Sequence, residues 1–355
     1  MTRHEKALKI LSEGTVIPAT PLALTQERKL NEKGLRLLMN YYLDSGVGGI
    51  ATAVHTTQFE IRDPKVNLFE PILKIVSDEI DKYEKEHDKV IVKVAGVCGP
   101  IEQAVKEAKL AKEYGYDAVL LSPGGLNDKS EDYMIERTQA VAQIMPTIGF
   151  YLQTAVGGRV FTYDYWKRVC AVDNVVAIKC ASFNRYTTHD VVRAAATSPR
   201  CDQITLYTGN DDNIVIDLLT KYKFTENGKT YTKSFDGGLL GHWTMWTQNV
   251  VNMFASIKEE RKKDKISADF LTLAAEVTDA NCVFFDAKNG FAGCIPGVHE
   301  VLRRQGLMEN ILCLNPDEVL SPGQSEEIDR IMSSYPHLTD DKFINEHIDD
   351  WKKRL

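Results

Sequence analysis

The chain has 355 residues, of which 43% are hydrophobic and 26% are charged, as in an ordinary soluble globular protein. A net charge of −7 without a concentrated lysine or arginine face argues against a nucleic-acid-binding protein. No apolar window approaches the length of a membrane span, and residues 1–13 form a charged amphipathic stretch rather than a signal peptide. We therefore expect a cytoplasmic protein with neither a nucleic acid nor a membrane as its partner.

Strand-like apolar runs alternate with helix-like segments along most of the chain. The runs cover residues 14–21, 47–54, 90–97, 118–122, 147–153, 175–180, 203–208 and 235–241. Helical patterns follow them at residues 27–44, 66–87, 101–114, 131–145, 163–171, 188–197, 213–222 and 243–258. Because each strand is followed by a helix, the order predicts the α/β class and a (β/α)₈ TIM barrel.

A doubly wound parallel sheet is the rival fold. Its best local support is Gly46-Val47-Gly48-Gly49, which precedes the second strand. Dinucleotide-binding glycines belong between a strand and the helix that follows it, so this motif is misplaced. The barrel is therefore the better interpretation.

Two segments fall outside the barrel repeat. Residues 222–234 alternate polar and apolar side chains around Asn227-Gly228, which predicts a β-hairpin. Beyond residue 261 the pattern is helix-like, at residues 268–285, 298–305, 325–334 and 341–353. We interpret residues 1–261 as the barrel with a short N-terminal helix, and residues 262–355 as a C-terminal helical extension packed on it.

The seven cysteines are scattered through apolar segments, none forms a CxxC pair, and their number is odd. This pattern predicts buried free thiols in a reducing compartment rather than disulfides or a zinc site.

Lys179 stands at the far end of the apolar run 175–180. Burying an ammonium group is costly and usually lowers its pKa, and a neutral amine is what imine formation with a carbonyl substrate requires. A lysine that extends to the barrel rim or pairs with a carboxylate fits the strand equally well. Lys93 also interrupts an apolar strand, but at its middle, where we expect an ion pair deeper in the barrel or toward its lower face.

Active sites of such barrels lie where the strands end. Residues 55–57 follow the second strand, Tyr151 lies on the fifth, residues 209–212 follow the seventh, and His242 follows the eighth. Together with Lys179 they suit an α-keto acid, because an amine can attack the ketone, a phenol can move protons, and hydroxyls with backbone N–H groups can hold the carboxylate.

Several of these motifs, in this order around a barrel, resemble the dihydrodipicolinate synthase and N-acetylneuraminate lyase superfamily of class I aldolases. The resemblance rests on residues 14–21 (GTVIPATP), His55-Thr56-Thr57, Tyr151, Ile178-Lys179 and residues 208–212 (TGNDD), and it runs from about residue 14 to about residue 323. It implies a Schiff-base enzyme that needs no metal or other cofactor. Homo-oligomers, dimers or tetramers, are expected from the resemblance.

The resemblance implies roles for individual residues. Lys179 would be the Schiff-base lysine and Tyr151 the proton-transfer phenol. Thr56 and Thr57 would bind the keto-acid carboxylate, and Gly209 would lie beside the bound imine.

Four further side chains are substrate-binding candidates. His55 stands where the family's carboxylate loop has glycine, and Arg159 would be the equivalent of the arginine that follows the family's tyrosine. Asn184 follows the lysine strand closely enough to touch the distal end of a substrate. His242 would line a pocket, or else belong to a packed, hydrogen-bonded rim.

Other departures concern the second substrate. The fourth strand ends in Ser122-Pro123-Gly124-Gly125, where the lysine-biosynthesis enzyme has a tyrosine pair. This difference puts aspartate semialdehyde in doubt and leaves the imine machinery intact. After the lysine strand, Arg185 either contacts a substrate or pairs with Asp211 or Asp212.

We therefore expect a Schiff-base-forming lyase, an aldolase or hydro-lyase, acting on pyruvate or another α-keto acid and an aldehyde or sugar-acid partner. One alternative is a metal-dependent barrel lyase with ligands from His55, Glu60, Asp211 and His242. The other is a barrel that binds a keto acid without turnover.

Overall fold

The computed structural model describes all 355 residues, and its centre is one parallel eight-stranded sheet in the order β1-β10-β7-β6-β5-β4-β3-β2. The strands are β1 Val16–Pro18, β2 Gly49–Thr52, β3 Val92–Val97, β4 Ala118–Leu121, β5 Thr147–Leu152, β6 Val175–Ala181, β7 Thr205–Thr208 and β10 Gly237–Leu240. A parallel bridge between Ala19 and Ala51 joins the two edge strands, so the sheet closes. The TIM barrel is confirmed, and the doubly wound sheet is wrong.

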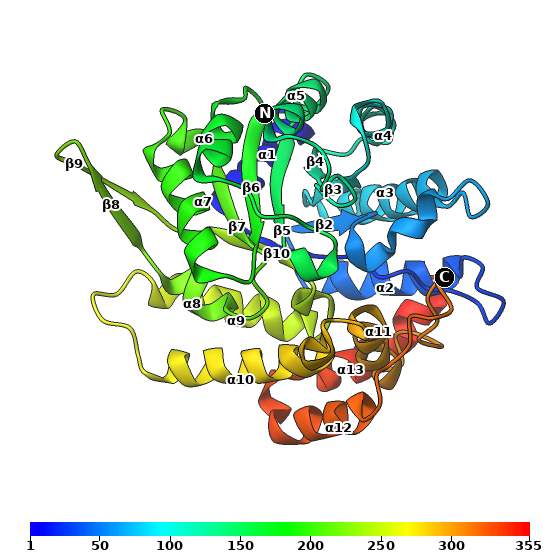
Figure 1. Cartoon of the computed structure of the whole chain (residues 1–355). Coiled ribbons are helices and arrows are strands. Elements are labelled where there is room, and N and C mark those ends of the chain that lie inside the picture. Colours follow the sequence, from blue (N-terminus) through cyan, green and yellow to red (C-terminus); the bar gives the residue numbers. More distant parts are fainter.

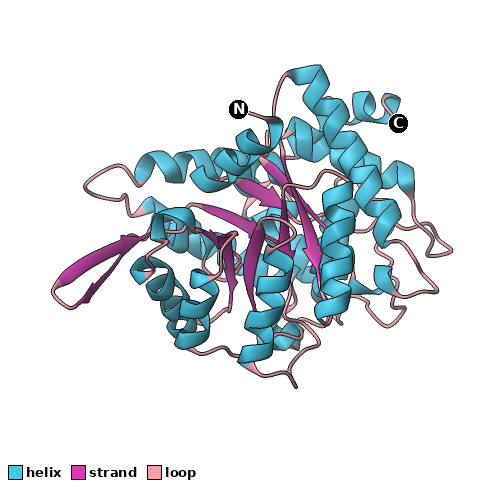
Figure 2. Cartoon of the chain, turned by 90° about the horizontal axis from the view of Figure 1, so that it is seen from above, coloured by secondary structure: helices cyan, strands magenta, loops and turns pink.

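Eight helices surround the strands (Figure 2). They are α2 Glu32–Asp44, α3 Phe69–His87, α4 Ile101–Glu113, α5 Glu131–Ala142, α6 Tyr163–Ala171, α7 Arg185–Thr197, α8 Ile214–Leu219 and α9 Thr247–Glu260. Helix α2 begins five residues later than predicted, because the side chain of Asn31 accepts a hydrogen bond from Gly34 N and so caps the helix there.

Side chains of the strands point alternately into the barrel and toward the helices, as the pleat requires. On β6, Ala177 and Ala181 belong to the apolar cluster inside the barrel. Ile178 and Cys180 belong to the larger cluster under the helices. Lys179 alternates with Ala177 and Ala181 on the inward face of β6, so the fold places its side chain in the barrel interior.

Helix α1 (Arg3–Glu13) packs at the end of the barrel opposite the C-terminal helices (Figure 1). Its residues Ala7 and Leu11 are buried in the barrel's interior cluster. The hydroxyl of Tyr207 donates a hydrogen bond of 2.7 Å to the carbonyl of Leu11. The barrel is therefore closed at this end.

The predicted hairpin is confirmed as the antiparallel pair β8 (Tyr222–Glu226) and β9 (Lys229–Lys233). Asn227 and Gly228 have φ values of 52° and 77°, the left-handed conformations that a tight two-residue hairpin turn requires. The hairpin projects away from the barrel (Figure 1).

The C-terminal extension consists of α10 (Asp269–Phe284), α11 (Cys294–Arg304), α12 (Gln324–Ser334) and α13 (Asp341–Lys353), and it lies on one side of the barrel (Figure 1). One continuous apolar cluster contains residues of both parts. Trp351 of α13 is buried against Tyr41 of α2, and its Nε1 donates to Asp44 Oδ2 at 2.7 Å. The extension is therefore anchored on the barrel's own helices.

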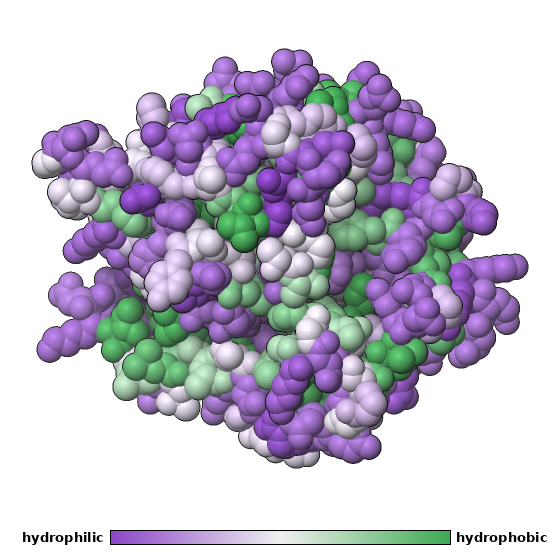
Figure 3. All heavy atoms as spheres, viewed as in Figure 1, coloured by the Kyte–Doolittle hydropathy of each residue, from purple (hydrophilic) through white to green (hydrophobic).

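Apolar side chains gather at the surface near the start of α10, on the face shown in Figure 3. They include Ile266 and Leu271, which are 45% and 60% exposed. That the chain forms a homo-oligomer stays a prediction.

None of the helices combines the length and apolarity that crossing a lipid bilayer demands.

Replacing Trp351 tests the anchoring of the extension. We expect Trp351→Ala to lower the free energy of unfolding by about 3–5 kcal/mol, the usual cost of deleting a buried aromatic side chain. Urea denaturation followed by circular dichroism measures the change. The exposed neighbour Lys352 provides the control, since Lys352→Ala should leave stability unchanged. Equal stability of the two variants would contradict the anchoring role.

Candidate active site

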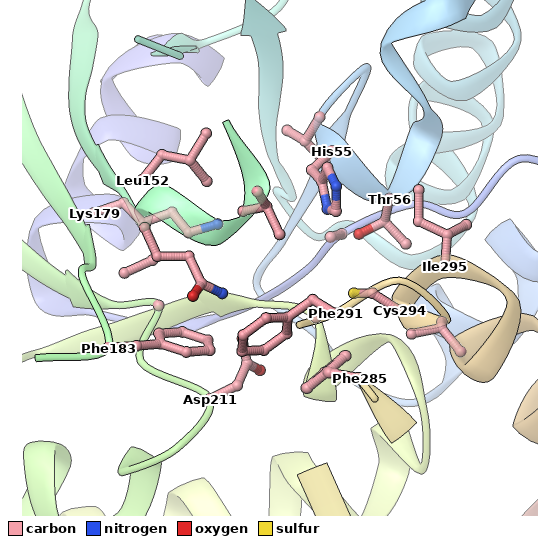
Figure 4. A pocket seen from close by; sticks show the side chains of 18 of the residues that line it. His55, Thr56, Leu152, Lys179, Phe183, Asp211, Phe285, Phe291, Cys294 and Ile295 are labelled. Atoms are coloured by element: carbon pink, nitrogen blue, oxygen red, sulfur yellow. The ribbon is translucent and has the colours of Figure 1, made fainter. Parts of the chain in front are cut away.

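A cavity of about 80 Å³ lies between the barrel and the extension (Figure 4). Since one water needs about 10–15 Å³ of such space, the cavity accommodates a small organic acid. Barrel residues and the loops after the strands contribute Ala19, Val54, His55, Thr56, Phe150, Leu152, Gln153, Val156, Lys179, Ala181, Phe183, Gly209, Asp211 and Gly241. The extension contributes Phe285, Phe291, Cys294, Ile295 and Val298.

Lys179 lies in this cavity, between Phe150 of β5 and Tyr207 of β7 in the sheet register. Its side chain is buried, and Nζ lies 4.4 Å from the centre of the Phe150 ring. No carboxylate oxygen lies within salt-bridge distance of Nζ, so the buried amine forms no direct ion pair. Burial lowers the pKa of Lys179, and the charge of Asp211 opposes that shift. These conditions favour a neutral amine.

Asp211 places a buried carboxylate on the same cavity. It follows β7, and its Oδ1 accepts a hydrogen bond of 2.9 Å from the backbone N–H of His242. Burial raises the pKa of Asp211, whereas the His242 hydrogen bond and the charge of Lys179 act in the opposite direction. The cavity thus holds an amine and a carboxyl group that are both displaced toward their neutral forms.

Gly209 fits closely against the lysine. A Cβ atom there would lie 2.6 Å from Lys179 Cε and 2.8 Å from Ala181 Cβ, so any larger residue would push the lysine side chain aside. The backbone N–H of Gly209 donates to the carbonyl of Cys180 at 2.7 Å. The predicted place of Gly209 beside the lysine agrees with this geometry.

Tyr151 does not point into the cavity, and the position predicted for it is wrong. Its hydroxyl accepts a hydrogen bond of 3.3 Å from Phe161 N, and its ring stacks on Trp166 of α6 with centroids 5.4 Å apart. Since residues alternate along β5, Phe150 takes the inward position beside Lys179. The barrel interior therefore offers a phenyl ring where a phenol was expected.

Some side chains of the loop after β2 line the cavity, and others form hydrogen bonds with other segments of the chain. His55 and Thr56 line the cavity. Thr57 does not, because its hydroxyl donates to the carbonyl of Thr20 at 2.7 Å. Burial and the charge of Lys179 lower the pKa of His55 to about 4, so its imidazole is neutral at neutral pH. Gln58 binds the extension, accepting a hydrogen bond from Leu314 N at 2.6 Å.

Three predicted substrate-binding side chains lie outside the cavity lining. Arg159 donates to the carbonyl groups of Leu126 and Lys129. Asn184 caps α7 with its side-chain oxygen. His242 belongs to a packed, hydrogen-bonded rim, the second of the two alternatives predicted for it, since its Nδ1 donates to Asn281 Oδ1 at 2.6 Å. Burial lowers the pKa of His242 to about 4.

Two other cations are held by carboxylates. Lys93 pairs with Asp81 at 2.6 Å, as expected, but the pair lies between β3 and α3 rather than deeper in the barrel. Arg185 pairs with Asp212 at 3.8 Å, one of its two predicted partners, and more closely with Asp217 at 2.6 Å. Asp217 was not among its predicted partners.

The metal-site alternative required His55, Glu60, Asp211 and His242 to converge. The structure brings no three histidine, cysteine, aspartate or glutamate side chains together in an arrangement that could hold a metal ion. The side chain of His242 is instead bonded to Asn281.

Sequence reasoning missed the extension's part of the site. The strand pattern gives no reason to place residues 285–298 over the barrel. The sequence places Asp211 among the strand-end residues 209–212 and makes it a possible metal ligand or partner of Arg185, but gives it no role in proton transfer. Phe150 was passed over because an adjacent tyrosine carried more obvious chemistry.

Comparisons with known proteins agree with this architecture. The model of the dihydrodipicolinate synthetase family matches residues 13–221. A curated relative, the 4-hydroxy-tetrahydrodipicolinate synthase of Clostridium novyi (strain NT), is 26% identical over 193 residues, which are 54% of this chain. The chain spans about 60% of the length of that relative.

Several solved structures share the fold at low sequence identity. Dihydrodipicolinate synthase from Oceanobacillus iheyensis is 16% identical, with a TM-score of 0.74 over 95% of this chain and 100% of its own. YagE from E. coli K12, in complex with pyruvate, is 15% identical, with a TM-score of 0.72 over 92% and 98%. N-acetylneuraminate lyase from Fusobacterium nucleatum, complexed with pyruvate, is 15% identical, with a TM-score of 0.70 over 92% and 99%. Since the family model matches more than half of the chain, the chain belongs to the dihydrodipicolinate synthetase family.

Proposed function

We propose that the protein is a Schiff-base-forming lyase whose Lys179 amine attacks the ketone of pyruvate or another α-keto acid. The observation that carries the proposal is a buried lysine, free of any direct ion pair, in a cavity at the end of the barrel. Burial lowers the pKa of Lys179, which favours the neutral nucleophile. Family membership supports the same chemistry, and two similar structures contain pyruvate.

The proposed reaction begins with a bond between Lys179 Nζ and the carbonyl carbon. The carbonyl oxygen takes one proton from the amine and one from the solvent and leaves as water. The nitrogen keeps one hydrogen, and the resulting iminium withdraws electrons from the neighbouring carbon. Aldol cleavage, aldol condensation and dehydration can all proceed from this intermediate, with an aldehyde or sugar acid as the second reactant. Thr56, which lines the cavity, would hold the keto-acid carboxylate through its hydroxyl, with the neutral imidazole of His55 beside it.

A second candidate function has one observation in its favour. The phenyl ring of Phe150 stands beside Lys179 where a phenol was expected, which suits a barrel that captures a keto acid without turnover. Such a protein would form the imine but would not remove a proton from the bound keto acid. Exchange of the methyl protons of pyruvate in heavy water separates the two candidates, since only a lyase catalyses it.

Trapping with borohydride tests the imine directly. We expect incubation with pyruvate and borohydride to attach the reduced keto acid to Lys179, found by peptide mass spectrometry. Lys179→Met should abolish the adduct. Lys93→Met is the matched control, because Lys93 is also buried but is bonded to Ser77 and Asp81 away from the cavity. An adduct on another lysine, or none on the wild type, would refute the proposed function.

The pH dependence of trapping tests the environment of the amine. Imine formation needs the neutral amine, so its rate should rise with pH through the pKa of Lys179. Burial lowers that pKa, so the rise should occur below the usual lysine value of about 10.4. Asp211→Asn removes a charge that raises this pKa, so the rise should move to still lower pH. A shift to higher pH in the variant would contradict the assigned coupling.

A further inference from the structure

The proposed lyase needs a group that removes a proton from the carbon next to the iminium. Tyr151 points away from the cavity, so it cannot serve. Besides Lys179 itself, the titratable side chains lining the cavity are His55, Asp211 and Cys294. The choice of proton acceptor is therefore among three groups.

Charge distinguishes these groups. Burial raises the pKa of the Cys294 thiol, so it keeps its own proton. A proton on His55 would give a second positive charge in a buried site, and burial together with the charge of Lys179 already lowers its pKa. A carboxylate that takes the proton from an iminium neutralises both charges at once. Such a transfer is favoured where water is excluded.

We propose that Asp211 is the catalytic acid and base of the site, which rests on the function proposed for Lys179. As the C–H bond of the iminium breaks, its electron pair forms the C=C bond of the enamine. The C=N π electrons return to nitrogen, and the proton goes to the Asp211 carboxylate. When the enamine carbon attacks an aldehyde, Asp211 gives its proton to the aldehyde oxygen and is again ionised. Atoms and charge balance without any further reactant.

The surroundings of Asp211 hold it in place for this role. Its Oδ1 accepts from His242 N at 2.9 Å, and its backbone carbonyl accepts from Asn281 Nδ2 at 2.7 Å. The oxygen of the same Asn281 amide binds the His242 ring at 2.6 Å. Asn281 belongs to α10, so the extension holds the Asp211 backbone and the ring of His242, the residue whose N–H binds the carboxylate. Figure 4 shows Asp211 and Lys179 directed toward the same cavity.

Asp211→Asn separates this proposal from the proposed function. Asparagine keeps an oxygen for the His242 hydrogen bond but cannot accept the proton. We expect the variant to retain the borohydride-trapped pyruvate adduct on Lys179. We expect it to exchange the methyl protons of pyruvate for deuterium about 10²–10⁴-fold more slowly than the wild type, the usual contribution of a general acid or base. Proton nuclear magnetic resonance in heavy water measures this rate.

Asp212→Asn is the matched control, since the Asp212 side chain faces Arg185 and does not line the cavity. It should exchange at the wild-type rate. Wild-type exchange in Asp211→Asn, or its loss in His55→Gln alone, would overturn the assignment. A wild-type protein that is trapped but does not exchange would overturn it as well, and would favour the keto-acid-binding barrel. Absence of the wild-type adduct would instead refute the Schiff-base function.

A separate observation concerns the second reactant. Of the 19 residues that line the cavity, 12 are hydrophobic, and the extension contributes Phe285, Phe291, Ile295 and Val298. Once the imine has formed, the iminium at Lys179 is the only positive charge in the cavity, because no arginine lines it and the imidazole of His55 is neutral. The iminium charge at Lys179 already faces the carboxylate of the keto acid. A second carboxylate or a phosphate would therefore be buried without a counter-charge, which is costly.

We infer that the acceptor is a small apolar aldehyde rather than a charged or sugar-derived one. With pyruvate as donor, we expect 3-methylbutanal to give product more than about 100-fold faster than succinic semialdehyde, since an unpaired buried charge costs several kcal/mol. Mass spectrometry of the products measures both rates. Val298→Arg should narrow or reverse the preference, while Ile266→Arg, at an exposed site, should not change it. A wild-type preference for the charged aldehyde would refute the inference, whereas loss of the Lys179 adduct would refute the underlying function.

Discussion

The site depends on keeping one amine away from water inside the barrel. Lys179 shares its inward face with Ala177 and Ala181, whose small side chains leave space for a long one, and Gly209 leaves the neighbouring space open. The ring of Phe150 covers the nitrogen, and no carboxylate bonds to it directly. A buried amine in these surroundings is held at a cost in folding free energy, which the large apolar cluster around the barrel must offset. The same desolvation lowers the pKa of the amine, which is the property that the proposed nucleophile needs.

Much of the fold could be predicted because its signals are local. The barrel followed from the alternation of apolar runs and helical patterns, and the hairpin from Asn227-Gly228. Lys179 stood out because an ammonium group contradicts the apolar strand that contains it. The helix starts were less accurate, since capping by a side chain such as Asn31 decides where a helix begins, and the hydrophobic pattern does not record it.

The orientation of the Tyr151 side chain could not be predicted from the local sequence pattern. Alternation along β5 requires residues 150 and 151 to face opposite ways, but both faces of the strand are buried, so the pattern does not say which is inside. The pairing of Phe150 with Lys179 settles the question, and that pairing is a contact between two strands. The sequence could not place Arg159 or choose between the two alternatives for His242 for a related reason, because the partners of both side chains lie on other segments of the chain.

The C-terminal extension contributes both to the wall of the cavity and to the contacts that hold Asp211. Phe285, Phe291, Ile295 and Val298 form an apolar wall over the cavity. Asn281, which precedes them on α10, binds both the Asp211 backbone and the His242 ring. A movement of α10 would therefore change the space open to a second reactant and the orientation of the carboxylate together. If the proposed roles hold, substrate choice and proton transfer are coupled through α10, although Lys179 itself belongs to the barrel.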